Sequence, residues 1–168
     1  MIARLLALAV LVLQSPSWAN DSVYTYHSMV GQPMQILVEG GSISFRSADV
    51  VESSTECLES DYVLCFFSPV VDAAIPADPP FLNDAWELNG TRFEVITHVP
   101  SLTLLGSTYK DIHVIRATRS GVRRGYAAVR YTDLYYSYEN GLIGFLYAHL
   151  NGEAIFLSSG YSGIVENP

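Results

Sequence analysis

The sequence predicts an all-β protein, either an antiparallel sandwich or a small barrel or half-barrel built from hairpins. Short runs of β-branched and aromatic residues recur along the chain, and Gly, Pro, Ser or Asp separate them. The dipeptide Asn-Gly, which favours tight type I′ turns, occurs at Asn89-Gly90, Asn140-Gly141 and Asn151-Gly152. No long stretch after residue 19 has the 3.6-residue period of an amphipathic helix, so we expect at most one short helix.

The first nineteen residues have the pattern of a secretory signal peptide. Arg4 precedes the apolar run Leu5–Leu13, and small residues stand where a peptidase would cleave after Ala19. That run is much shorter than the roughly 20 residues that a membrane-spanning helix needs. We therefore expect a soluble secreted or periplasmic protein without a membrane span, whose residues 20–168 form a single β domain.

The expected strands follow one another at close spacing. They are Val23–Tyr26, Met34–Glu39, Ser42–Arg46, Tyr62–Phe67, Ala85–Leu88, Thr91–His98, Leu102–Leu105, Lys110–Thr118, Tyr131–Glu139, Leu142–His149 and Glu153–Ser158. The last three, joined by two Asn-Gly turns, predict a three-stranded meander.

Two segments do not have this strand pattern. Ser47–Glu59 begins with a serine followed by acidic residues, which favours a short helix. Pro69–Asp84 contains four prolines, and proline lacks the amide that a central strand must donate. We expect the second segment to be an extended crossover connection between sheets, with a lid or binding edge as the alternative.

Cys57 and Cys65 are the two cysteines of the chain. An even count in an exported protein favours a disulfide, and their spacing suits a bridge across a short hairpin. We expect a structural bond rather than a redox-active pair, which would more often be a Cys-x-x-Cys motif.

Charge is unevenly distributed along the chain, whose formal net charge is −8. Residues 47–91 contain nine acidic residues and neither Lys nor Arg. Residues 116–130, in contrast, contain five arginines and no acidic residue. The acidic balance argues against nucleic acid as a partner. The two segments are interpreted as attracting each other within one fold, and the alternative is that the arginines bind an anionic ligand.

The candidate binding site is a surface of tyrosine and arginine. Tyr131 and Tyr135 share one face of a predicted strand, because they are separated by an even number of positions. Exposed tyrosines offer a flat apolar ring with a polar tip, which suits a sugar or a protein partner. Arg123, Arg124 and Arg130 lie just upstream, and the five residues together form the predicted ligand-binding set.

A second candidate site combines histidines with carboxylates. Glu94 and His98 are expected on one face of their strand, as are Asp111 and His113 on theirs. If the two strands pair, these four groups would converge to hold a metal or to serve as acid and base. A solvated outer face is the simpler interpretation, because Phe93, Val95, Ile112 and Val114 would form the matching apolar faces.

The sequence contains no recognisable catalytic or cofactor motif. Local histidine pairs with metal-ligand spacing, a nucleophile elbow and phosphate-binding glycine loops are all missing. We therefore predict a non-enzymatic binding or envelope-interaction module with no catalytic residue, cofactor or bound metal. Its partner would be an anionic or saccharide-like ligand or an envelope protein. The alternatives are a small secreted hydrolase or metal-dependent enzyme using Glu94, His98, Asp111 and His113, and a carrier of a lipid-like ligand in a β cavity.

Overall fold

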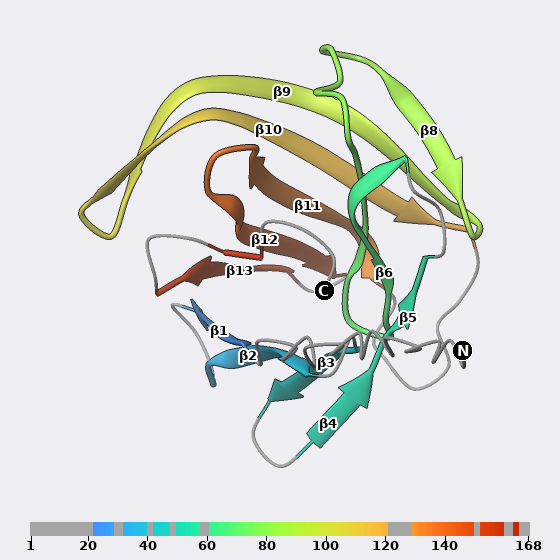
Figure 1. Cartoon of the computed structure of the whole chain (residues 1–168), viewed down its shortest axis with the longest axis vertical. Helices are drawn as coiled ribbons and strands as arrows, with labels where there is room; N and C mark the ends of the chain where they lie inside the picture. The colour runs from blue at the N-terminus through green and yellow to red at the C-terminus, as the bar shows by residue number, and fades with distance from the viewer. Residues whose placement is uncertain are drawn as a thin grey trace, which may run out of the picture.

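A computed structural model describes residues 22–28, 32–39, 42–47, 50–57, 61–120, 129–149, 152–159 and 163–164. The predicted leader, Asn151 of the third predicted Asn-Gly turn, Arg123 and Arg124 lie outside these residues. The described ranges form thirteen β-strands in two antiparallel sheets and include no helix, which confirms the all-β prediction (Figure 1).

The larger sheet has ten strands in the described ranges, and it curves strongly (Figure 1). In spatial order its strands are β4 (Val50–Ser53), β3 (Ser42–Ser47), β2 (Met34–Glu39), β1 (Ser22–Ser28), β13 (Gly152–Ser158), β12 (Gly141–His149), β11 (Val129–Ser137), β10 (Ser107–Arg119), β9 (Thr91–Leu104) and β8 (Ala85–Leu88). The smaller sheet contains β5 (Thr55–Glu56), β6 (Tyr62–Phe67) and β7 (Asp72–Pro76). The predicted meander is confirmed as β11, β12 and β13.

The smaller sheet packs between two arms of the larger one. The rings of Phe66 and Phe45, the latter on β3, have centroids 5.5 Å apart. The next residue, Phe67, points the other way and lies 6.3 Å from the ring of Phe93 on β9. Successive side chains of a strand point to opposite faces, so both faces of β6 contact the large sheet.

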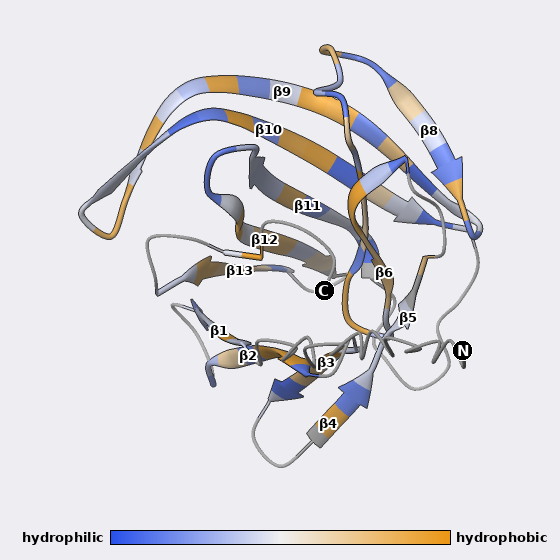
Figure 2. Cartoon of the chain, in the orientation of Figure 1, coloured by the Kyte–Doolittle hydropathy of each residue, from blue (hydrophilic) through white to orange (hydrophobic). Residues whose placement is uncertain are grey.

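Burial on both faces explains the composition of these two inner strands. Leu64 to Phe67 and Asp72 to Ile75 are all buried, and all but Asp72 belong to the main hydrophobic core. A strand with one face in water would alternate apolar and polar residues, as β9 and β10 do over much of their length (Figure 2). The apolar run in β6 is therefore the sequence signature of an enclosed strand.

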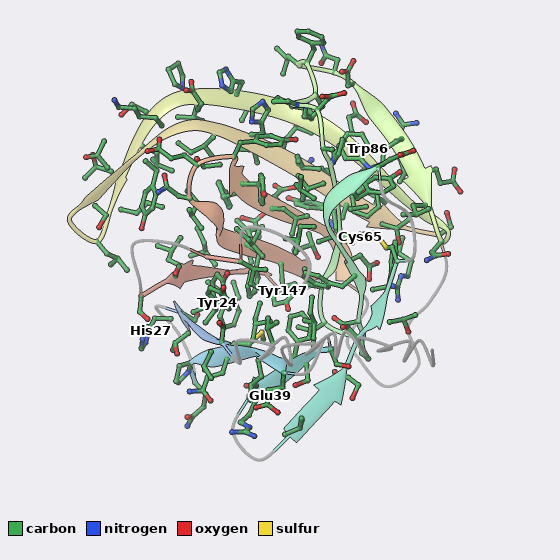
Figure 3. All side chains as sticks on the ribbon, in the orientation of Figure 1. Tyr24, His27, Glu39, Cys65, Trp86 and Tyr147 are labelled. Carbon is green, nitrogen blue, oxygen red and sulfur yellow. A yellow bond between two sulfur atoms is a disulfide. The ribbon has the colours of Figure 1, made fainter. Side chains whose placement is uncertain are left out.

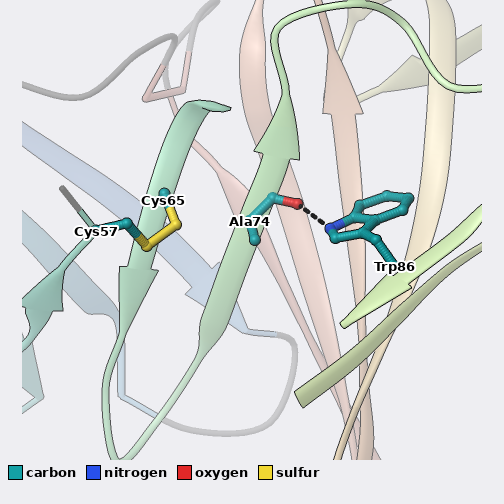
Figure 4. The surroundings of a disulfide bond; sticks show 4 residues. All are labelled: Cys57, Cys65, Ala74 and Trp86. Carbon is teal, nitrogen blue, oxygen red and sulfur yellow. Dashed lines mark hydrogen bonds between the residues drawn. A yellow bond between two sulfur atoms is a disulfide. The ribbon is translucent and has the colours of Figure 1, made fainter. Parts of the chain in front are cut away.

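Side chains of the large sheet cap the free edge of β7. The indole nitrogen of Trp86 donates to the carbonyl oxygen of Ala74 at 3.0 Å, as Figure 4 shows. The Tyr138 hydroxyl donates to the carbonyl of Pro76 at 2.7 Å. Buried carbonyl groups need such partners, because an unsatisfied one costs about 1–3 kcal/mol.

The opposite edge of the inner sheet carries the disulfide. Cys57 and Cys65 form a bond with their Cα atoms 5.4 Å apart, just beyond the paired residues of β5 and β6 (Figure 4). The prediction of a bridge across a short hairpin is confirmed. Figure 3 shows Cys65, Trp86 and Tyr147 turned toward the interior, whereas His27 projects outward from β1.

A buried carboxylate ties the start of β7 to the large sheet. Asp72 accepts hydrogen bonds from the Arg119 guanidinium and from the Thr91 hydroxyl, the latter at 2.9 Å. Asp72 belongs to the acidic segment and Arg119 to the arginine segment. This ion pair therefore shows the two segments attracting each other within the fold.

The predicted helix over Ser47–Glu59 is wrong. The described part of that segment forms β4 and β5, and β4 pairs with β3 through residues such as Val51 and Glu52. Acidic residues after a serine suit a helix start. However, the β-branched Val50 and Val51 complete a sheet edge, and tertiary pairing overrides the local preference.

The prediction of a plain crossover over Pro69–Asp84 is also wrong, because the segment contains β7. The proline rule itself holds: β7 is an edge strand, and its proline, Pro76, stands at its end. Ser68 shapes the preceding turn, since its hydroxyl oxygen accepts hydrogen bonds from the amides of Val70 and Val71.

The hairpin turns differ partly from their predicted form. Asn89-Gly90 is a two-residue turn with both φ values positive, as predicted. At the β11–β12 turn only Gly141 is left-handed among the described residues, and the loop has three residues. The predicted strands Thr91–His98 and Leu102–Leu105 merge into one long β9, which ends at Leu104. The chain then turns into β10 at Leu105-Gly106, with φ values of 49° and 86°.

We predict that Arg119→Met destabilises the protein by about 3–5 kcal/mol, because it leaves the Asp72 carboxylate buried without its cation. Urea unfolding measures this change. The matched control is Arg92→Met, which breaks the exposed Arg92–Glu94 pair and should change stability by no more than about 1 kcal/mol. Equal losses in the two variants would contradict an anchoring role for Asp72.

We predict that Leu105→Asn stabilises the protein by roughly 0.5–1 kcal/mol. Leu105 has a left-handed backbone that disfavours leucine, and its side chain is 72% exposed, so little burial is lost. Asn89→Leu at the other turn should destabilise by a similar amount. Thermal unfolding of both variants tests the pair, and a lower stability of Leu105→Asn would overturn the prediction.

Candidate functional site

Two histidines face each other across β9 and β10 on the concave side of the large sheet. His98 and His113 are register partners, and their ring centroids lie 4.9 Å apart. His113 also contacts the ring of Tyr138 edge-on at 5.5 Å. The opposite partner of His113 on β11 is Tyr136, which is in the main core, so this pair lies at the border of the core.

A break in the β9–β10 ladder brings a carboxylate to this pair. Asp111 has a φ of 50° and lies opposite Pro100, between the register pairs Lys110–Ser101 and Ile112–Val99. Proline has no amide to donate, which interrupts the ladder, and aspartate tolerates left-handed backbone better than most residues. The Asp111 Oδ1 atom lies 3.8 Å from Nε2 of His98.

These residues line a pocket with a volume of about 400 Å³. His98, His113 and Tyr138 supply rings to its wall, and Pro79 from the segment after β7 lies beside them. Lys110, Asp111, Ser137 and Glu139 supply its polar part. The volume falls within the usual range of small-molecule sites, roughly 300–1,000 Å³.

His113 is buried, and its Nδ1 atom has no hydrogen-bond partner among the described residues. Burial lowers the pKa of His113, and the nearby His98 lowers it further. Hydrogen bonding to the backbone of Asp111 and Pro80 acts in the opposite direction but is weaker. The fold therefore favours the neutral imidazole, which has one donor and one acceptor nitrogen.

Glu94 does not join this cluster, and its predicted alignment with His98 is wrong. Ile115 pairs with Val95 whereas Val114 pairs with Thr97, so a β-bulge inserts Ile96 into the strand. One extra residue reverses the alternation, and Glu94 and His98 then lie on opposite faces. Glu94 instead forms an ion pair with Arg92 at 3.1 Å.

The predicted tyrosine surface lies on the outer face of β11, where its groups contact one another. The guanidinium carbon of Arg116 is 3.8 Å from the ring centroid of Tyr131. Arg116 donates two hydrogen bonds to Asp133, at 2.7 and 2.8 Å, which raise the pKa of the arginine. The Tyr131 hydroxyl donates to Glu153 at 2.9 Å, and this bond raises the pKa of the tyrosine.

Tyr135 shares that face but packs into a second, smaller core. This cluster is built on Tyr109, Ile112 and Ile143. Burial in it raises the pKa of Tyr135. Of the predicted arginines, Arg130 is exposed, and Arg123 and Arg124 lie outside the described residues. The structure thus brings Tyr131 and Tyr135 to one face, where protein groups already contact both.

Sequence reasoning missed several groups of the pocket. Lys110, Ser137 and Glu139 carry no pattern that distinguishes them from ordinary strand and turn residues. The ring of Tyr138 contacts that of Tyr136, with centroids 5.2 Å apart. Its position against Pro76, however, depends on the buried inner sheet. The arrangement of Arg116 with Asp133 was also missed, although their opposite charges were a signal.

Comparison with known proteins gives no family for this chain: no protein-family model, curated protein or solved structure matched it. In the described ranges, no three His, Cys, Asp or Glu side chains form a group that could hold a metal ion. The same part of the chain has no helix long and apolar enough to cross a membrane.

We predict that protonation of His113 weakens the fold between pH 7.5 and 5.5. An unfolded histidine has a pKa near 6.5, and the folded value is lower, so the unfolded state takes up protons first. The stabilisation is present above pH 6.5 and is lost as the pH falls, by at most about 1.4 kcal/mol per pH unit.

Urea unfolding of the wild type and His113→Phe at several pH values measures this loss. The variant should show a shallower pH dependence, whereas His27→Phe, at an exposed position on β1, should behave as the wild type does. Parallel profiles for wild type and His113→Phe would contradict the prediction.

Proposed function

We propose that the protein is an exported, non-enzymatic binding module whose pocket on β9, β10 and β11 takes a small polar ligand. The observation that carries the proposal is that His113, whose buried Nδ1 atom has no partner among the described residues, is one of the residues that line a ligand-sized pocket. A buried polar atom without a partner is costly, so a ligand that supplies the missing hydrogen bond gains affinity.

The groups around the pocket favour binding over hydrolysis. The Ser137 hydroxyl donates to the carbonyl of Lys110 at 3.0 Å, and the Tyr138 hydroxyl donates to Pro76. Both are held by backbone oxygens rather than by a histidine that would activate them as nucleophiles. Because Glu94 lies on the opposite face, the four-residue set of the enzyme hypothesis is incomplete.

A carrier of lipid-like ligands is less well supported. Such a carrier needs apolar space inside the curved sheet, and here β6 and β7 occupy that region with buried side chains such as Leu64, Phe66 and Ile75. The pocket on β9–β11 instead includes charged residues in its lining. These features favour a polar ligand.

Export rests on the leader pattern and on the disulfide. A bond between Cys57 and Cys65 is compatible with an oxidising compartment, either a periplasm or the outside of the cell. In such a setting a binding module would act on envelope components or on small molecules in the surroundings.

The proposal is tested by histidine side-chain NMR during titration with D-glucose, glycine, acetate and inorganic phosphate. We predict that at least one probe shifts the His98 and His113 signals saturably, and that His98→Ala weakens this response at least tenfold. The control Tyr131→Phe lies on the outer face and should respond as the wild type does. If these four probes, extended to N-acetylglucosamine, glucosamine and glucuronate, all leave both histidine signals unchanged, the pocket is not the binding site.

A further inference from the structure

The pocket combines a wall of rings with charged groups of both signs. His98, His113 and Tyr138 supply rings to the lining. The side chains of Lys110, Asp111 and Glu139 are exposed, and they belong to the same lining. A ligand with one apolar surface and several polar groups around it would use both parts.

The net negative charge of these three residues disfavours an anionic ligand. Asp111 and Glu139 would repel a carboxylate or a phosphate, and Lys110 opposes the attraction that the two carboxylates exert on an ammonium group. The neutral imidazole of His113, which burial favours, adds no charge. The pocket has no cluster of a single sign of the kind that sites for strongly charged ligands use.

The hydrogen-bonding capacity of the pocket is biased toward acceptors. Ionised carboxylates only accept, so Asp111 and Glu139 need donors from a ligand. Backbone groups of Asp111 and Pro80 interact with the His113 ring. The Nδ1 atom of that ring has no hydrogen-bond partner among the described residues, and a ligand hydroxyl, which both donates and accepts, would supply one.

We propose that the ligand is a neutral saccharide unit. A pyranose has an apolar C–H face that suits the aromatic rings, and its hydroxyl groups are donors that suit Asp111, Glu139 and the Nδ1 atom of His113. This assignment rests on the proposed function, because it requires that the pocket on β9–β11 binds a ligand.

The experiment compares two neutral sugars with a close charged analogue of each. N-acetylglucosamine and D-glucose are the neutral probes, and glucosamine and glucuronate are their charged counterparts. Their affinities are measured at pH 7.5 by histidine side-chain NMR of the full mature chain. We expect at least one neutral sugar to bind at least fivefold more tightly than both charged ones.

Conservative variants test the role of the carboxylates. Asp111→Asn keeps the side-chain shape and tolerates the left-handed backbone, and Glu139→Gln is similarly conservative. Each should weaken binding of the neutral sugar about tenfold, and each should reduce the discrimination against glucuronate. The matched control Glu153→Gln removes a carboxylate from the outer face and should leave binding unchanged.

The outcomes separate this inference from the proposed function. If glucosamine or glucuronate binds more tightly than both neutral sugars, the saccharide assignment is wrong while the pocket remains a binding site. The saccharide assignment is also wrong, and the pocket remains a binding site, if glycine, acetate or phosphate shifts the NMR signals of the histidines and none of the four sugars does. If no probe of either experiment shifts His98 or His113, both the assignment and the proposed function fail.

Discussion

The enclosure of the β6–β7 hairpin within the curved sheet is the constraint on which the rest of the structure depends. An open sheet of ten strands has one face that must be covered, and here the inner sheet covers it by packing against both arms, through Phe66 on one side and Phe67 on the other. Enclosure also creates a cost, because polar groups of β7 leave water. Trp86, Tyr138 and Arg119 offset that cost by hydrogen bonding to Ala74, Pro76 and Asp72.

The same constraint positions the candidate site. Tyr138 donates to Pro76 at the end of β7, and its ring then contacts His113. The chain beyond Pro76 brings Pro79 to the pocket and Pro80 to the His113 ring. The pocket is therefore formed where the inner hairpin leaves the core and meets β10 and β11. A change that loosened β7 would be expected to affect the pocket as well as stability.

Much of the fold was predictable, because strands leave a local signature. The limits of β2, β6 and β8 agree with the predicted Met34–Glu39, Tyr62–Phe67 and Ala85–Leu88, and the disulfide followed from cysteine number and spacing. The errors arise where distant pairing decides the structure. Residues after Ser47 have local helix signals but complete a sheet edge, and β7 forms in a proline-rich segment because it is an edge strand whose one proline, Pro76, stands at its end.

The site illustrates how one residue alters a prediction of function. Strict alternation of side chains along the strand predicted Glu94 and His98 on the same face. The β-bulge at Ile96 places them on opposite faces. Bulges carry little sequence signal, because the extra residue is an ordinary strand former. Asp111 is the opposite case, since its left-handed backbone at Pro100 brings the carboxylate close to His98. Because Glu94 lies on the other face and Asp111 stays beside His98, the predicted cluster of four groups becomes two imidazole rings with one carboxylate beside them. That set accepts hydrogen bonds well, and no nucleophile is positioned beside a histidine among the described residues of the pocket, which is why we propose binding rather than hydrolysis.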